Sequence, residues 1–157
     1  MKTLLILVGK TADSNIKTLV ENYISRIGHY VPFETKIVPE PKNTASLTRE
    51  KQCKAEGDGI KKLLLGDDWI ILLDEHGKEY TSVEFSDKLK RMWQNSSKRL
   101  VFVIGGPYGF SPEIKSLAKE TMSLSRMTFS HQMVRLIFAE QFYRALTIIK
   151  GEPYHHE

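Results

Sequence analysis

Short apolar runs alternate along the chain with longer segments in which apolar residues recur three or four positions apart. Continuous apolar runs of about five residues are typical of strands that are covered on both faces. The runs are Leu4–Val8, Trp69–Leu73 and Leu100–Ile104, and Phe33–Val38 and Met122–Ser125 are two further strand candidates. The pattern therefore predicts the α/β class, with a mostly parallel sheet and helices on both faces.

Helix signals fill the segments between these strands. Asp13 or Ser14 caps a segment with helical apolar spacing from Ile16 to Ile27, and Gly28 ends it. The other predicted helices span 46–65, which is lysine-rich and expected to be exposed, 81–95 and 134–149, and one more begins at Ser111-Pro112. In a parallel sheet, ligands bind beyond the carboxyl ends of the strands, so the chemistry is expected in the loops after Leu73, Ile104 and Leu124.

Size and composition narrow the class of protein. A chain of 157 residues with 41% hydrophobic residues suits one domain, 1–157, with one core. Its single cysteine, Cys53, excludes an internal disulfide and fits a reducing compartment. The first apolar run stops at Gly9, and no later stretch approaches the ~20 residues of a membrane helix. We therefore expect a soluble, cytoplasmic protein, whose net charge of +4 mildly favours phosphate-bearing partners.

Two of the candidate loops allow two interpretations each. The glycine loop 105–109 has neither the dinucleotide fingerprint nor the P-loop spacing, so its glycines either admit a flat ligand or form a tight turn. Asp74 and Glu75 either bind ribose hydroxyls or a cationic group, or are solvated turn residues. The tail 153–157 is either a frayed end or part of a site, and a metal site is disfavoured because no third ligand stands at suitable spacing.

Three segments carry a resemblance to a known family. They are VFVIGGPYGFSPEI, SLSRMTFSHQMVRLIFAEQFYRA and the closing PYHHE, and the start LLILVGK also matches. The chain resembles the large-subunit ribosomal RNA pseudouridine N3-methyltransferases of the SPOUT superfamily. The resemblance implies an enzyme that transfers a methyl group from S-adenosyl-L-methionine to N3 of a pseudouridine in 23S ribosomal RNA of the assembled ribosome. It also implies a trefoil knot in the carboxyl-terminal half and a homodimer with cofactor sites near the interface.

Residues for the cofactor pocket follow from the same resemblance. They are Leu73, Gly105, Leu124, Ser125, Arg126, Met127, Thr128 and Phe129. Backbone groups of a bent loop can hydrogen-bond to adenine, and apolar side chains can enclose its ring. Methyl transfer then needs the acceptor nitrogen in line behind the methyl carbon, at roughly 3 to 3.5 Å.

The acceptor N3 must lose a proton, and the tail supplies the candidate groups. His155 is the predicted proton acceptor and Tyr154 is predicted to stack on or orient the base; alternatively, solvent takes the proton and the tail only positions RNA. Arg135, Arg144 and His131 are predicted phosphate or tail-orienting contacts. Arg135 is alternatively part of a helix-surface ion pair, and surface salt bridging with Glu140 explains Arg144. Where the family's tail has arginine this chain has His156, which puts a phosphate contact there in doubt.

Partner contacts are less specific. Scattered cations are candidate phosphate contacts, namely Lys10, Lys61, Lys62, Lys88, Lys90 and Arg91. The last helix has a broad apolar surface that packs either on core and partner or on the core alone, formed by Val134, Ile137, Phe138, Phe142 and Leu146. Competing functions are ribose 2′-O-methylation of transfer RNA, a noncatalytic ribosome-binding factor, and a generic nucleotide-binding protein.

Overall fold

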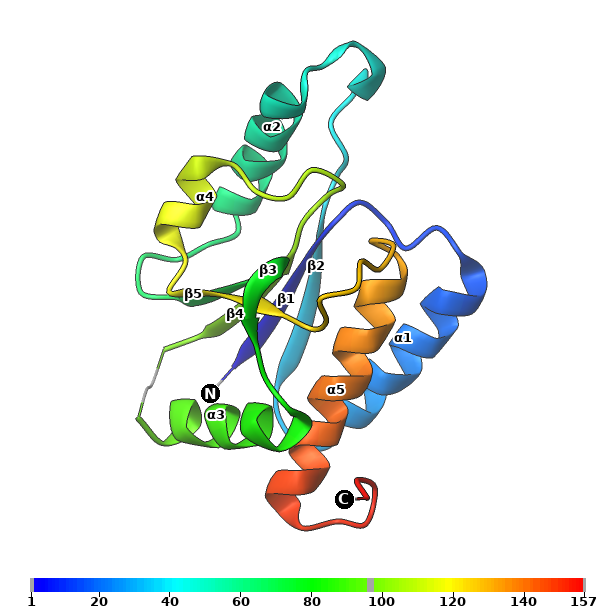
Figure 1. The fold of residues 1–157 in the computed structure, drawn as a ribbon, viewed down its shortest axis with the longest axis vertical. Coiled ribbons are helices and arrows are strands. Elements are labelled where there is room, and N and C mark those ends of the chain that lie inside the picture. The colour runs from blue at the N-terminus through cyan, green and yellow to red at the C-terminus, as the bar shows by residue number, and fades with distance from the viewer. Residues whose placement is uncertain (1, 96–97, 157) are drawn as a thin grey trace.

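A sheet of five parallel strands runs through the middle of the protein (Figure 1). The computed structural model describes residues 2–95 and 98–156. Along the sheet the strands follow the order β2-β1-β4-β3-β5, and each neighbouring pair is parallel. Their bounds are β1 Thr3–Val8, β2 Phe33–Val38, β3 Trp69–Glu79, β4 Leu100–Ile104 and β5 Glu120–Ser123. The predicted α/β class is confirmed.

Helices cover both faces of this sheet, as the apolar runs predict (Figure 1). The helices are α1 Ser14–Ile27, α2 Arg49–Lys61, α3 Ser82–Asn95, α4 Pro112–Leu117 and α5 Met133–Lys150. Helix α5 contacts both α1 and α3 on one face, and α2 and α4 lie on the other. Side chains of β1 alternate between the two cores: Leu5 packs in the α5 cluster and Ile6 in the α2 cluster.

The α5 side holds the aromatic core of the protein. The Phe102 ring lies 4.9 Å from that of Phe138 and 5.9 Å from that of Phe142, measured between centroids. Each buried phenylalanine contributes about 1.5 to 3 kcal/mol of hydrophobic stabilisation. Phe138, Phe142 and Leu146 are therefore core residues of the subunit, at most 2% exposed, and only Val134 and Ile137 of the broad apolar face remain half-buried.

Helix α2 is shorter and more buried than the sequence predicts. A 3-10 turn, Thr44–Ser46, precedes it, and Thr48 caps it by accepting the Lys51 N–H at 3.1 Å. The helix predicted over 46–65 is present but spans 49–61, and only one of its faces is exposed because the other packs against the sheet and the glycine loop. That face includes two glycines, whose lack of a side chain permits close approach. A Cβ at Gly59 would lie 2.4 Å from Val38 Cγ1.

Strand β3 continues through a segment that the sequence predicts as a polar turn. Its pairing with β5 is interrupted by a bulge between Leu73 and Lys78 and then resumes to Glu79. A side chain at Gly77 would meet the β5 backbone at 2.6 Å, so only glycine fits this pairing. Strand β5 correspondingly begins at Glu120 rather than at Met122. Backbone pairing, not apolar burial, extends both strands, and apolar periodicity does not reveal it.

No helix among residues 2–95 and 98–156 is long and apolar enough to cross a membrane.

Candidate functional site

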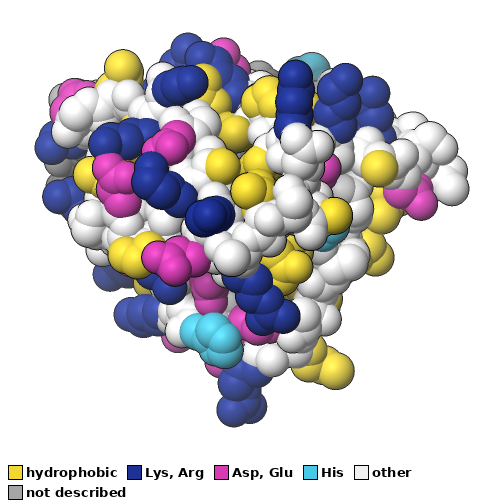
Figure 2. Space-filling view, turned by 90° about the horizontal axis from the view of Figure 1, so that it is seen from above, with side chains coloured by type: hydrophobic (Ala, Val, Ile, Leu, Met, Phe, Trp, Pro, Cys, Tyr) yellow, Lys and Arg dark blue, Asp and Glu magenta, His cyan; other side chains and the backbone are white. Residues whose placement is uncertain are grey.

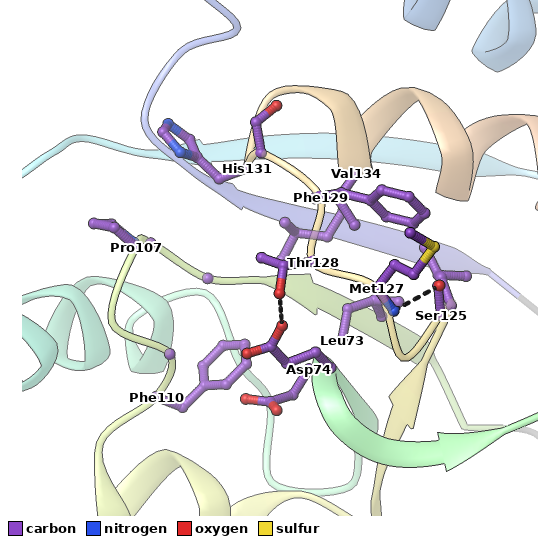
Figure 3. Close-up of a pocket in the computed structure, with 17 residues that line it drawn as sticks. Leu73, Asp74, Pro107, Phe110, Ser125, Met127, Thr128, Phe129, His131 and Val134 are labelled. Atoms are coloured by element: carbon purple, nitrogen blue, oxygen red, sulfur yellow. Dashed lines mark hydrogen bonds between the residues drawn. The ribbon is translucent and has the colours of Figure 1, made fainter.

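A pocket of about 330 Å³ opens at the carboxyl ends of β3, β4 and β5 (Figure 3). Three loops form its walls, and they are the loops that the strand order brings together: the bulge after Leu73, the glycine loop after Ile104, and the segment 124–131 that leads into α5. The predicted position of the site is therefore the position of this pocket.

The β3 bulge forms the first wall and carries its carboxylates. Asp74 Oδ1 accepts the His76 N–H at 2.8 Å, which shapes the bulge, and Asp74 and Glu75 both line the pocket. Glu75 Oε2 accepts the Thr128 hydroxyl at 2.5 Å. The bulge is thus tied to the 124–131 loop across the pocket. Glu75 therefore has a protein partner while its side chain stays 42% exposed, so both interpretations from sequence, a ligand contact and a solvated turn residue, stay open.

The glycine loop forms the second wall and is both a tight turn and a pocket surface. Gly109 has φ +79° and donates its N–H to Gly106 O at 3.3 Å, which closes the turn. A Cβ at Gly105 would lie 2.9 Å from the Phe110 ring, so this position admits no side chain without displacing that ring. The tight turn is therefore observed, and the binding of a flat ligand against this loop stays a prediction.

The third wall presents apolar side chains that nothing in the subunit covers. Ser123 and Ser125 shape it, since the Met127 N–H donates to Ser125 Oγ at 2.9 Å. Met127 is 77% exposed and Phe129 36% exposed, and both line the pocket. An exposed apolar rim on a pocket is the signature of a surface that a ligand or a partner covers.

The structure brings seven of the eight predicted cofactor residues to this pocket. Those that line it are Leu73, Gly105, Leu124, Ser125, Met127, Thr128 and Phe129. Arg126 does not line it; its side chain is 88% exposed and lies 3.6 Å from the Glu79 carboxylate. Sequence reasoning missed Phe110, whose ring fixes the space above Gly105, and no pattern marks it as more than an apolar turn residue.

Arg135 is completely buried at the first turn of α5. Its guanidinium donates to the backbone oxygens of Val8 at 2.7 Å and Gly9 at 2.9 Å, to the Thr11 hydroxyl at 3.0 Å, and to His131 O in the loop before α5, 3.1 Å away. Burial lowers its pKa. The helix-surface ion pair considered from sequence is wrong, because the side chain is 0% exposed. The geometry gives Arg135 a positioning role: it fixes α5 and the adjoining 124–131 loop to the end of β1.

The tail forms a second cluster at the other end of α5. Arg144 donates from Nη2 to Glu140 Oε1 at 2.5 Å and from Nη1 to His155 Nδ1 at 3.1 Å. The Tyr154 hydroxyl donates to the same Glu140 oxygen at 3.1 Å and lies 3.4 Å from the Tyr23 hydroxyl. Tyr154 and His155 of the tail therefore pack against α5. Burial raises the pKa of Tyr154 above its ordinary value.

Predicted site residues thus fall into two groups that one subunit does not join. His131 lines the pocket, whereas Tyr154 and His155 pack near Arg144. Helix α5 separates the groups, since Glu140 and Arg144, which hold the tail, lie 7 and 11 residues beyond Met133, or about 10 to 17 Å along the helix axis. Figure 1 shows the chain end beside the far end of α5 from the 124–131 loop. Sequence reasoning missed Tyr23, which periodicity marks only as one residue of a helix's apolar face.

The cations predicted to contact phosphate also divide into two kinds. Lys61 is paired with Glu113 at 2.5 Å, and Lys88 with Glu120 at 2.6 Å, so their charges are already compensated. The remaining members, Lys10, Lys62, Lys90 and Arg91, are exposed, as is Lys61. Figure 2 shows Lys and Arg side chains spread over the upper face rather than gathered in one patch.

These walls define a class of protein before any comparison: an α/β protein that binds a partly apolar small molecule at the carboxyl edge of a parallel sheet. A sequence model of the family described as "Predicted SPOUT methyltransferase" matches residues 1–155. The chain belongs to this family of methyltransferases, so the predicted resemblance is confirmed.

Curated relatives extend over the full chain. A Bacteroides fragilis protein is 54% identical and a Phocaeicola vulgatus protein 52% identical, in both cases over all of this chain and all of the relative. Both relatives are named ribosomal RNA large subunit methyltransferase H. The crystal structure of a probable methyltransferase from Bordetella pertussis Tohama I is similar at a TM-score of 0.58 and 10% identity, over 92% of this chain and 94% of that one. That similarity concerns the fold alone.

Proposed function

We propose that the protein transfers the methyl group of S-adenosyl-L-methionine to N3 of a pseudouridine in 23S ribosomal RNA of the assembled ribosome. One domain, 1–157, with the knot that the family implies, carries the activity in the cytoplasm, where ribosomes are. The observation that carries the proposal is the pocket itself, which gathers seven residues predicted from the family motifs. Relatives at over 50% identity whose name states ribosomal RNA methylation support it.

The pocket fits the methyl donor in both shape and chemistry. Leu73, Leu124 and Met127 offer apolar faces for the adenine ring, and the backbone of the two bent loops offers polar groups at its edge. Bound there, S-adenosylmethionine supplies an electrophilic methyl group on a sulfonium. The glycine loop and the 124–131 loop, held by Phe110 and Arg135, fix the direction in which that methyl group points.

A homodimer resolves the separation of pocket and tail. Met127 and Phe129 are exposed at the pocket rim, while Tyr154 and His155 are held against Glu140 and Arg144, about 10 to 17 Å farther along α5. We therefore propose that a second copy brings its tail to the pocket. In this arrangement each active site combines the pocket of one subunit with Tyr154 and His155 of the other. The half-buried Val134 and Ile137 provide apolar surface for the contact.

The hydrogen bond of His155 defines its part in the chemistry. Arginine can only donate, so His155 Nδ1 is the acceptor and the neutral ring carries its proton on Nε2. Nε2 has no partner among residues 2–95 and 98–156. Because this Nε2 is buried in the subunit, we propose that RNA binding exposes its N–H, which then donates to a carbonyl oxygen next to N3, where negative charge collects when N3 loses its proton. We therefore favour deprotonation to solvent with stabilisation of the anion by His155 over direct proton transfer to His155.

The experiment that tests the proposal is transfer of labelled methyl from S-adenosylmethionine to ribosomes that lack the modification. Separated subunits and naked RNA run in parallel, and nucleosides are identified by mass. We expect N3-methylpseudouridine, mainly from whole ribosomes. Ribose-methylated nucleosides from transfer RNA would establish the competing specificity. Cofactor binding without label on any substrate would establish a noncatalytic ribosome-binding factor.

A further inference from the structure

A second cavity, of about 160 Å³, lies on the other side of the glycine loop from the first pocket. Gly106, Pro107 and His131 line both, so the two cavities meet at this loop. Helix α2 forms the opposite wall with Gln52 and Glu56. In Figure 3 this helix lies behind the loop that carries Pro107. None of the residues assigned to the methyl donor so far occupies this cavity.

Glu56 makes the second cavity chemically distinct. The residue is 3% exposed, and its Oε2 accepts only a long hydrogen bond from Gln52 Nε2, at 3.3 Å. Its other oxygen, Oε1, is buried and has no partner among residues 2–95 and 98–156. Burial raises the pKa of this carboxyl group. A buried carboxylate with an unused acceptor is costly unless a ligand completes it, and it occurs where charge has a function.

The glycine loop is built to bring this carboxylate close to the ligand. A Cβ at Gly106 would lie 2.5 Å from Glu56 Oε2, so any side chain there would displace the carboxylate. Cys53, one turn before on α2, contacts the same loop at Tyr108 O, 3.5 Å away. The absence of a side chain at Gly106 therefore permits the close approach of Glu56. The adenine pocket alone does not explain why the second residue of the loop is glycine.

Charge determines which ligand group the cavity suits. Glu56 and Glu40 both line it, and no lysine or arginine does so among the described residues. Arg135 is near, but its donors are directed at Val8, Gly9 and Thr11. A small, anionic cavity with a free carboxylate oxygen suits a primary ammonium group, which offers three donors.

We propose that this cavity binds the α-ammonium group at the methionyl end of the methyl donor, with Glu56 as its acceptor. The inference rests on the proposed function, because it takes the first pocket to hold the adenosine end. The molecule then spans the glycine loop, with adenine on the Leu73 side and the ammonium group on the Glu56 side. Binding both ends across one rigid loop fixes the sulfonium between them.

Calorimetric titration with two nucleosides tests the proposal on the full chain. S-adenosylhomocysteine retains the amino-acid end, whereas 5′-methylthioadenosine lacks it. We expect Glu56→Gln to weaken S-adenosylhomocysteine binding about 10- to 100-fold, the range for a hydrogen bond to a charged group, and to leave 5′-methylthioadenosine binding within about twofold. Glu50→Gln, an exposed carboxylate in the first turn of the same helix, is the control and should change neither.

The outcomes separate this inference from the proposed function. Unchanged S-adenosylhomocysteine affinity in Glu56→Gln, or equal losses for both nucleosides, would overturn the ammonium site while the adenosine pocket stands. If the wild-type protein bound neither nucleoside, the proposed function would fail and this inference with it. A ligand-side comparison is independent of any variant: the deaminated analogue of S-adenosylhomocysteine should bind the wild type about as weakly as S-adenosylhomocysteine binds Glu56→Gln.

Folding of the variant is checked by thermal unfolding of the ligand-free protein. Burial raises the folded-state pKa of Glu56 above its ordinary value of 4.5. Ionisation of this group therefore opposes folding as the pH rises from 4.5 through the raised pKa. The stabilising effect of the protonated form is fully present below pH 4.5 and is lost as the pH rises through the raised folded-state pKa. Glu56→Gln is therefore expected to melt no lower than wild type at pH 7, and a melting temperature well below it would contradict this account of the apo cavity.

Discussion

The two ends of helix α5 present opposite kinds of surface. At its start lies an open pocket whose rim exposes Met127 and Phe129, and whose shape depends on backbone held by buried groups such as Arg135. At its end lies a closed cluster in which Glu140, Arg144 and Tyr154 satisfy one another. The first end has an open surface that suits a ligand, whereas the polar groups of the second end are already paired within the subunit. The difference supports the proposal that a complete site combines two copies of the chain, with α5 as the spacer in each.

The largest expected effect comes from removing the clamp at the pocket end. Arg135→Met leaves the buried oxygens of Val8, Gly9 and His131 without donors, at about 1 to 3 kcal/mol each before relaxation. We expect about 3 kcal/mol of destabilisation or more, measured by urea unfolding, with loss of cofactor binding. The exposed Arg91→Met is the matched control and should stay within about 0.5 kcal/mol of wild type. Wild-type stability in Arg135→Met would contradict the positioning role.

At the tail end, His155 should affect turnover and not the cofactor. His155→Ala removes the free Nε2–H, and we expect about a 100-fold lower kcat with S-adenosylhomocysteine affinity unchanged. His155→Gln retains a side-chain N–H donor that cannot act as a base. Partial activity in His155→Gln would support hydrogen-bond donation, whereas activity equal to that of His155→Ala would favour proton transfer to the imidazole.

A variant of Glu140 tests whether the closed cluster serves only to orient the tail. Glu140→Gln removes the charge that Arg144 and Tyr154 share. We expect about a tenfold lower kcat, from a less well oriented tail, and an unchanged affinity for the cofactor. A loss of cofactor affinity equal to the loss of kcat would mean that the two ends of α5 are not independent within a subunit.

The smallest effect is expected at Arg126, the one predicted cofactor residue outside the pocket. Its ion pair with Glu79 is exposed on both sides, and such pairs contribute about 0 to 1 kcal/mol. Arg126→Ala should therefore bind S-adenosylhomocysteine within about twofold of wild type in the same calorimetric titration. A tenfold loss would place Arg126 at the ligand and revise the third wall of the pocket.

Sequence patterns predicted the strands of the sheet, the ends of most helices and the position of the pocket, because each rests on local burial or capping. In Leu4–Val8 and Leu100–Ile104 the side chains on both faces of the strand are apolar, which predicts buried strands in the middle of the sheet. The continuation of β3 past Asp74 was not predictable, since the pairing partner, β5, lies more than 40 residues later. The role of Arg135 was misjudged and that of Glu56 was missed for a related reason. In the sequence, a buried charged residue cannot be distinguished from an exposed one.

Mixing two inactive variants tests the composite site most directly. Gly105→Val blocks the pocket of one subunit, and His155→Ala disables the tail of the other. After co-refolding in equal amounts, half of the dimers pair the two variants, and each of these has one intact pocket facing one intact tail, so about a quarter of wild-type activity is expected to return. No recovery, with mixed dimers verified by mass, would show that pocket and tail act within the same subunit and would contradict the account.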